Sequence, residues 1–197
     1  MFVVEMTAGQ LSGSQALKAD ALDFFADGVT YALSFWAIGK PLGVRATAAF
    51  AKGLSLVAIG LYIALTTLYR FFVSGVPEGE VMGIIGFAAL AANLISVWLL
   101  VAYKDGDANV RSVWLCSRND AIGNVAVMLA ALGVWGTATK WPDLLVAGIM
   151  AGLFLSSSVQ IVRQSLAELR AAKIGTEHAH DHAHPHDHAH APTNATA

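Results

Sequence analysis

Five long runs of apolar residues constrain this chain more than any other feature of its sequence. A helix that crosses the hydrocarbon core of a bilayer takes about 20 mostly apolar residues, and each run reaches that length. The runs cover roughly Ala16–Ile38, Ala46–Phe72, Val81–Tyr103, Val113–Gly136 and Leu144–Leu166. Strands of a membrane β-barrel would alternate apolar and polar residues over about ten positions, and these runs do not. The sequence therefore predicts an α-helical membrane bundle.

The composition agrees with lipid as the solvent. Apolar residues make up 56% of the 197 residues and charged residues 13%, against about 45–50% and about 25% in an ordinary soluble domain. A single cysteine, Cys116, excludes an internal disulfide. The formal net charge of −2 indicates no nucleic-acid partner. No apolar run holds a histidine, and no phosphate-binding glycine loop occurs, so we expect neither an enzyme nor an ATP-driven pump.

The N-terminal segment Phe2–Leu11 is apolar but covers only half a span. It has no charged leader, which argues against a signal peptide. Either the first helix is short or broken, or it begins upstream of Met1. We count this segment as a partial first span and expect an all-α integral membrane protein with a six-helix bundle. The bundle would occupy residues 1–170, followed by a tail over residues 171–197.

The loops indicate how the bundle is oriented. Basic residues collect in alternate loops and after the last span; they are Lys40, Arg45, Lys104, Arg111, Arg163, Arg170 and Lys173. The opposite loops are poorer in basic residues, with Glu78 and Glu80 in one and Lys140 and Asp143 in the other. The positive-inside rule then places both chain ends in the cytoplasm. We expect a multi-pass protein of a bacterial inner membrane.

Three carboxylates interrupt the second span, within the stretch KADALDFFADG. At about 100° per residue, Asp23 and Asp27 lie about 40° apart and one turn along, and Asp20 lies within about 60° of both. Ionisable residues inside a span are costly and mark functional sites. We therefore predict Asp23 and Asp27 as site residues. Asp20 is a weaker candidate, because it could instead be hydrated at the interface or paired with Lys18.

The fifth span carries a second polar group, CSRNDAIGN. Cys116 and Asp120 are four residues apart and share a helix face, which Asn124 continues. Cys116 is either a metal ligand or a small buried apolar residue. Asn119 and Asn124 would first be hydrogen-bonding residues between helices and only second be metal ligands.

Two helices with acidic residues at this spacing can pool their side chains into one anionic cage. With a fourth donor such a cage suits tetrahedral Zn²⁺, and carboxylates alone would also admit Mn²⁺, Fe²⁺ or Cd²⁺. A divalent cation would cancel the repulsion between the carboxylates, and so would protons. Because either a metal dication or protons can neutralise such a site, it meets the physical requirement for exchanging metal for protons.

The last part of the chain differs in composition from the rest. The stretch Glu177–Ala191 reads EHAHDHAHPHDHAHA, a low-complexity sequence that predicts disorder. It contains all the histidines of the protein, namely His178, His180, His182, His184, His186, His188 and His190. The interleaved Ala, Asp and Pro argue against a purification tag. Neutral imidazoles bind Zn²⁺ and similar ions, so we expect a cytoplasmic tail that captures metal.

With these residues in view, the chain resembles the cation diffusion facilitator family of metal transporters. The stretches GSQALKADALDFFADG and LCSRNDAIGNVAV resemble that family's second-helix and fifth-helix signatures. Asp23, Asp27 and Asp120 stand at ligand positions, and Cys116 stands where a histidine is usual. The resemblance implies a six-helix bundle, a homodimer and exchange of cytoplasmic metal for protons. The chain looks like the short form that lacks the family's C-terminal cytoplasmic domain.

Three functions remain open at this point. The first is a secondary transporter that exports Zn²⁺, Cd²⁺ or a similar dication by proton antiport with alternating access, and that needs no cofactor. The second is a membrane protein that binds or senses metal without transporting it. The third is a cation channel, which would require rings of charge in place of a closed cage.

Overall fold

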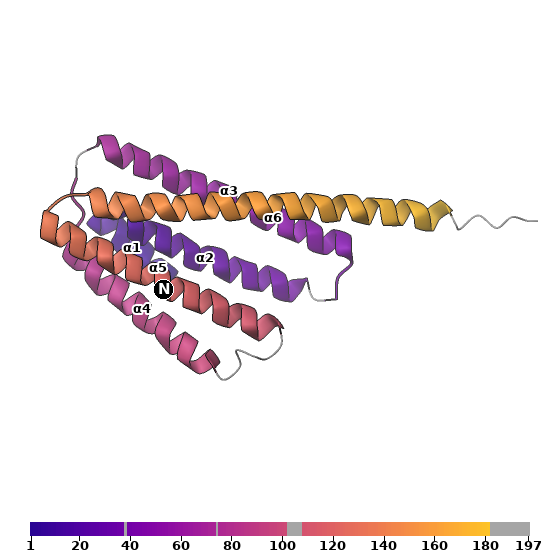
Figure 1. Ribbon diagram of the computed structural model, residues 1–197, viewed down its shortest axis with the longest axis horizontal. Coiled ribbons are helices and arrows are strands. Elements are labelled where there is room, and N and C mark those ends of the chain that lie inside the picture. The colour runs from indigo at the N-terminus through magenta and orange to yellow at the C-terminus, as the bar shows by residue number, and fades with distance from the viewer. Residues whose placement is uncertain (38, 74, 102–107, 182–197) are drawn as a thin grey trace, which may run out of the picture.

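The computed structural model describes the chain except residues 38, 74, 102–107 and 182–197. Over the described residues the protein consists of six helices and no strand (Figure 1). They are α1 (Phe2–Ser12), α2 (Gln15–Trp36), α3 (Leu42–Phe72), α4 (Gly79–Leu100), α5 (Ala108–Thr137) and α6 (Trp141–Asp181). The predicted all-α bundle is confirmed.

Four of these helices have the length and apolar composition of a membrane span: α3, α4, α6 and the Asp120–Thr137 part of α5. Helix α2 has 22 residues, which at about 1.5 Å per residue is also long enough to cross the hydrocarbon core. Its carboxylates make it less apolar than the others. Helix α1 has 11 residues and is half a span, as the sequence predicts.

Helix α6 is longer than its apolar run. It continues past Leu166 to Asp181, so the expected boundary at residue 170 falls inside a helix. The first part of this extension, AELRAAK (residues 167–173), consists of strong helix formers, which continue a helix without apolar surroundings. In Figure 1 this end of α6 projects beyond the other helices.

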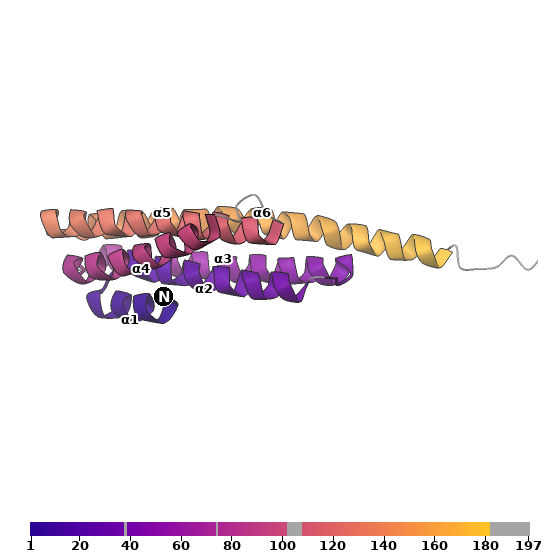
Figure 2. The same cartoon turned by 90° about the horizontal axis from the view of Figure 1, so that it is seen from below.

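The helices form two layers with α1 outside them. Figure 2 shows α5 and α6 in one layer, α2, α3 and α4 in the next, and α1 on the outer side of the second layer. The most extensive pairings are α3 with α6, α4 with α5, and α1 with α2. Helix α2 also contacts α3, α5 and α6. The helix that carries most of the predicted acidic site is therefore central.

Two apolar cores pack on different faces of α2, and Val146 of α6 contacts both. The first joins α2 to α1, α4 and α5 around Leu17, Met82 and Val127. The second joins α2 to α3 and α6 around Ile63 and Phe154. Because both cores include α2, its position and rotation depend on every other helix of the bundle.

Glycines set the close approach of α3 to α6. A Cβ added at Gly53 would lie 2.8 Å from Val162 Cγ2, and one at Gly60 would lie 2.9 Å from Leu155 Cγ. These contacts leave no room for a side chain, so the helix backbones can come together. The G-x-x-x-G of α6 differs, since a Cβ at Gly148 or Gly152 would meet nothing within 4 Å.

The N-terminus of α2 is fixed by a side chain from α6. Asp143 Oδ1 accepts hydrogen bonds from Ser14 Oγ at 2.6 Å and from the Ala16 N–H at 2.9 Å, and Oδ2 accepts one from the Gln15 N–H at 2.9 Å. Ser14 Oγ in turn accepts from the Leu17 N–H at 3.0 Å. A carboxylate here satisfies free N–H groups and faces the positive end of the helix dipole. Asp143 thus anchors α2 against α6.

Candidate metal site

Five acidic side chains from three helices lie within electrostatic range of one another inside the bundle. We call them the carboxylate cluster: Glu5 of α1, Asp20, Asp23 and Asp27 of α2, and Asp120 of α5. The three residues of α2 follow one another on one side of the helix, as the sequence predicts. Glu5 was not among the predicted site residues. Its only sequence signal is a carboxylate inside an otherwise apolar N-terminal segment.

The cluster is removed from solvent to different degrees. Glu5 is 0% exposed and Asp20 is 1% exposed. Asp23, Asp27 and Asp120 are each half-buried. The cluster therefore combines fully enclosed carboxylates with three that retain some access.

The carboxylates are close enough to repel one another. Asp120 interacts electrostatically with Asp27, Asp23 and Glu5. Asp20 interacts with Glu5, Asp23 and Asp120. The backbone of α5 also approaches Asp20, because a Cβ on Gly123 would lie 3.4 Å from Asp20 Oδ1. Helices α2 and α5 contact each other, and their carboxylates lie within electrostatic range of one another.

The cluster does not form a closed coordination shell. Among the side chains that the structure describes, no three His, Cys, Asp or Glu residues are grouped tightly enough to hold a metal ion together. Side-chain movement, or donors outside the described set, would have to complete a coordination sphere.

Several buried polar atoms around the cluster have no hydrogen-bond partner among the residues that the structure describes. They include both carboxylate oxygens of Glu5, Oδ2 of Asp20, and both side-chain polar atoms of Asn124. Asn124 is 0% exposed and lies one turn after Asp120 on α5. Buried polar groups in proteins are ordinarily paired, and an unpaired one costs about 1–3 kcal/mol or more if charged. The unpaired oxygens among these atoms mark a place where a cation or protons would be stabilising.

The sequence leaves two other environments open for Asp20, hydration at the interface and pairing with Lys18, and both are wrong. At 1% exposure it is not hydrated at an interface. Nor does Lys18 neutralise it, because the charged neighbours of Lys18 are Arg70 and Asp143. Lys18 lies at the anchored end of α2, where its side chain packs against Gly9 of α1. Asp20 belongs with the other carboxylates.

Other predicted site residues lie outside the described side chains. Cys116 and Asn119 are on α5, and only the backbone is described at these positions. The same holds for His178 and His180, in the last turn of α6. The remaining tail histidines lie beyond the described residues; they are His182, His184, His186, His188 and His190.

Comparison with known proteins identifies a family that this chain matches. Residues 1–170 match the family model described as the cation efflux transmembrane domain. The zinc transporter ZitB of Escherichia coli (strain K12) is 31% identical over 180 residues, which are 85% of this chain and 58% of the relative. A cadmium, cobalt and zinc/H(+)-K(+) antiporter of Bacillus subtilis (strain 168) is 27% identical over 180 residues, 83% of this chain and 57% of the relative.

The metal cation efflux system protein CzcD of Cupriavidus metallidurans is 26% identical over 175 residues, 83% of this chain and 55% of the relative. The chain therefore spans little more than half the length of these curated relatives. The matched part is the helical bundle with its carboxylate cluster.

Proposed function

The chain belongs to the cation efflux transmembrane family, and on that premise we propose that it exports divalent metal cations from the cytoplasm. The observation that supports this most directly is the convergence of α1, α2 and α5 on one group of buried and half-buried carboxylates that repel one another. A dication bound there would offset the repulsion among these carboxylates.

We propose Asp23, Asp27 and Asp120 as the metal-binding carboxylates. Cys116 lies one turn before Asp120 and would supply a fourth donor as a thiolate. A thiolate with carboxylates favours Zn²⁺ or Cd²⁺ over harder ions. The names of the relatives support the same choice, since they include a zinc transporter and a cadmium, cobalt and zinc antiporter.

Proton antiport follows from the same repulsion. Protons that enter from outside would neutralise the carboxylates and release the metal, and their departure would restore a site for metal from the cytoplasm. Alternating exposure of a central site is how secondary transporters couple two such ions. The antiporter named among the relatives supports this coupling.

We further propose a homodimer in a bacterial inner membrane with a cytoplasmic C-terminus. The exposed Gly148 and Gly152 of α6 would let a second copy approach closely. The basic residues beside the α2–α3 connection and at the end of α6 support the orientation through the positive-inside rule.

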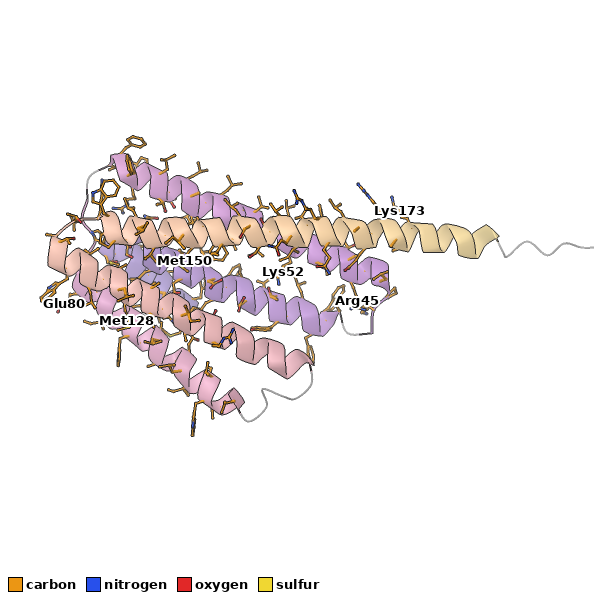
Figure 3. The ribbon with its side chains drawn as sticks, in the orientation of Figure 1. Arg45, Lys52, Glu80, Met128, Met150 and Lys173 are labelled. Atoms are coloured by element: carbon orange, nitrogen blue, oxygen red, sulfur yellow. The ribbon has the colours of Figure 1, made fainter. Side chains whose placement is uncertain are left out.

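Flux into proteoliposomes tests the transport proposal. We expect saturable Zn²⁺ movement that depends on a pH gradient and is lost in Asp27→Ala and in Asp120→Ala. Glu80→Ala is the matched control, because this carboxylate is exposed at the start of α4, away from the cluster (Figure 3). Metal binding without flux would indicate a sensor instead. Non-saturating flux that ignores the proton gradient would indicate a channel.

The same assay tests Cys116 as a ligand. If its thiolate binds the metal, Cys116→His and Cys116→Ala will change the ranking of transported ions among Zn²⁺, Cd²⁺, Co²⁺ and Mn²⁺. An unchanged ranking in both variants would place Cys116 among the packing residues.

A further inference from the structure

A second polar feature lies away from the carboxylate cluster. It is a cavity of about 600 Å³ between α2, α3 and α6, near the end of the bundle where α2 ends and α3 begins. Thr30 and Leu33 line it from α2, and Gln164 and Ser165 line it from α6. We call this space the α2–α3–α6 pocket.

Two cations from α3 line this pocket, Arg45 and Lys52. They are seven residues apart and therefore lie on one face of the helix, about 10 Å apart along its axis. Figure 3 labels both near this end of the bundle, with Lys173 projecting from the other side of α6. Arg45 is exposed and Lys52 is half-buried.

Neither cation has a partner in the part of the chain that the structure describes. Among the described residues, neither the Arg45 guanidinium nor Lys52 Nζ forms a hydrogen bond or an ion pair. The pocket contains one carboxylate, Glu168, which accepts a hydrogen bond from Gln164 Nε2 at 3.0 Å. Two cations against one carboxylate leave the pocket positively charged, so it would repel a metal dication and attract an anion.

The surroundings place the pocket at the depth of lipid headgroups. Phe35 is 80% exposed and Trp36 is 55% exposed beside it, on the last turn of α2. Lys40 Nζ lies 5.6 Å from the centre of the Trp36 ring. An exposed tryptophan with a nearby lysine at the end of a span is typical of the membrane–water interface.

We propose that the α2–α3–α6 pocket binds a phosphate-bearing anion, presented at this depth by the headgroup of an anionic phospholipid. Arg45 would contact the phosphate at the rim and Lys52 would reach it from below with its flexible stem. Basic pockets between transmembrane helices bind lipid headgroups in this way. The acyl chains would lie along the exposed apolar side chains of the bundle.

Thermal unfolding of the purified full chain in detergent tests this without any transport measurement. We expect phosphatidylglycerol to raise the melting temperature more than phosphatidylcholine does. Lys52→Gln and Arg45→Gln should each weaken the apparent affinity for phosphatidylglycerol roughly fivefold, the effect of about one lost charge near a lipid surface. Lys173→Gln, which removes the same charge on the other side of α6, should leave the affinity unchanged.

A second experiment with inorganic phosphate distinguishes a lipid headgroup from free phosphate as the bound anion. A phosphate effect that Lys52→Gln abolishes would support the pocket and assign it to the free ion. Equal effects of both lipids, or a phosphatidylglycerol effect that survives both pocket substitutions, would overturn the proposal. So would a change in oligomeric state in Lys52→Gln at unchanged lipid affinity, because a second copy would then occupy the pocket. Each readout is independent of the carboxylate cluster and of metal flux.

Discussion

At the scale of single residues, two buried carboxylates differ in whether hydrogen-bond donors surround them. Asp143 is 1% exposed and accepts three hydrogen bonds from the N-terminus of α2. Glu5 is 0% exposed, and within the described part of the chain both of its oxygens lack a hydrogen-bond partner. A buried carboxylate with donors stabilises a fold, and one without them destabilises it unless an ion or a proton arrives. Asp143 therefore has a structural role, whereas Glu5 belongs with the proposed site.

Replacing Asp143 tests its structural role. Asp143→Ala leaves two N–H groups of α2 and the Ser14 hydroxyl without an acceptor, so we expect the free energy of unfolding to fall by about 3 kcal/mol or more. Asp143→Asn keeps one acceptor oxygen and should lose less. The measurement is thermal unfolding in detergent, with exposed Glu80→Ala as the control. Equal stability of wild type and Asp143→Ala would contradict an anchoring role.

Replacing Glu5 should act in the opposite direction. Glu5→Gln keeps the shape of the side chain and removes a buried charge that Asp20 and Asp120 repel. We expect higher thermal stability without metal at alkaline pH. The gain should shrink as the pH falls, because wild-type Glu5 then takes up a proton and loses its charge.

The same substitution should weaken metal binding, since the cluster loses one negative charge. Isothermal titration with Zn²⁺ at neutral pH measures this. A variant that is both less stable and unchanged in metal affinity would show that Glu5 is a packing residue.

At the scale of helices, small residues decide which pairs lie close. Gly53 and Gly60 bring α3 onto α6, and this pair forms its own core with α2. The apolar runs predict where these helices are, because transfer into lipid depends on each residue's own chemistry. The runs do not predict that α3 pairs with α6, or that α6 continues to Asp181.

A larger residue at Gly60 should separate α3 from α6. Its Cβ would lie 2.9 Å from Leu155 Cγ and 3.2 Å from Phe154 Cβ, both on α6. We expect Gly60→Val to cost about 1–3 kcal/mol through overpacking, read as a lower melting temperature in detergent. Gly136→Val on α5 places the same side chain where no atom lies within 4 Å and should cost much less. Equal losses in the two variants would contradict this packing.

At the scale of the whole molecule, the bundle holds two polar regions of opposite charge. The carboxylate cluster lies among α1, α2 and α5, and the positively charged pocket lies among α2, α3 and α6. Helix α2 contributes to both from different faces. A dication is therefore attracted to one region, and an anionic headgroup to the other. The histidine-rich tail would add a third region, outside the bundle.

Deleting Glu177–Ala191 tests the tail as a metal collector. A tethered chain of imidazoles raises the local metal concentration without altering the site itself. We expect a higher apparent KM for Zn²⁺ with Vmax nearly unchanged in proteoliposomes that expose the tail to the metal side. A version with every tail histidine replaced by Asn retains the length and should behave like the deletion. Unchanged uptake at low metal in both would rule out this role.

The amino-acid order alone is sufficient for the membrane class, the helix positions and the facing of Asp23 and Asp27, because burial in lipid and helical periodicity depend on nearby residues along the chain. It does not predict that Glu5 joins the carboxylate cluster, that Lys18 does not pair with Asp20, or that Asp143 caps α2. Each of these depends on which side chains another helix presents, since a carboxylate is stabilised or strained by neighbours that are distant in the sequence. The packing of α1, α5 and α6 around α2 makes that distinction.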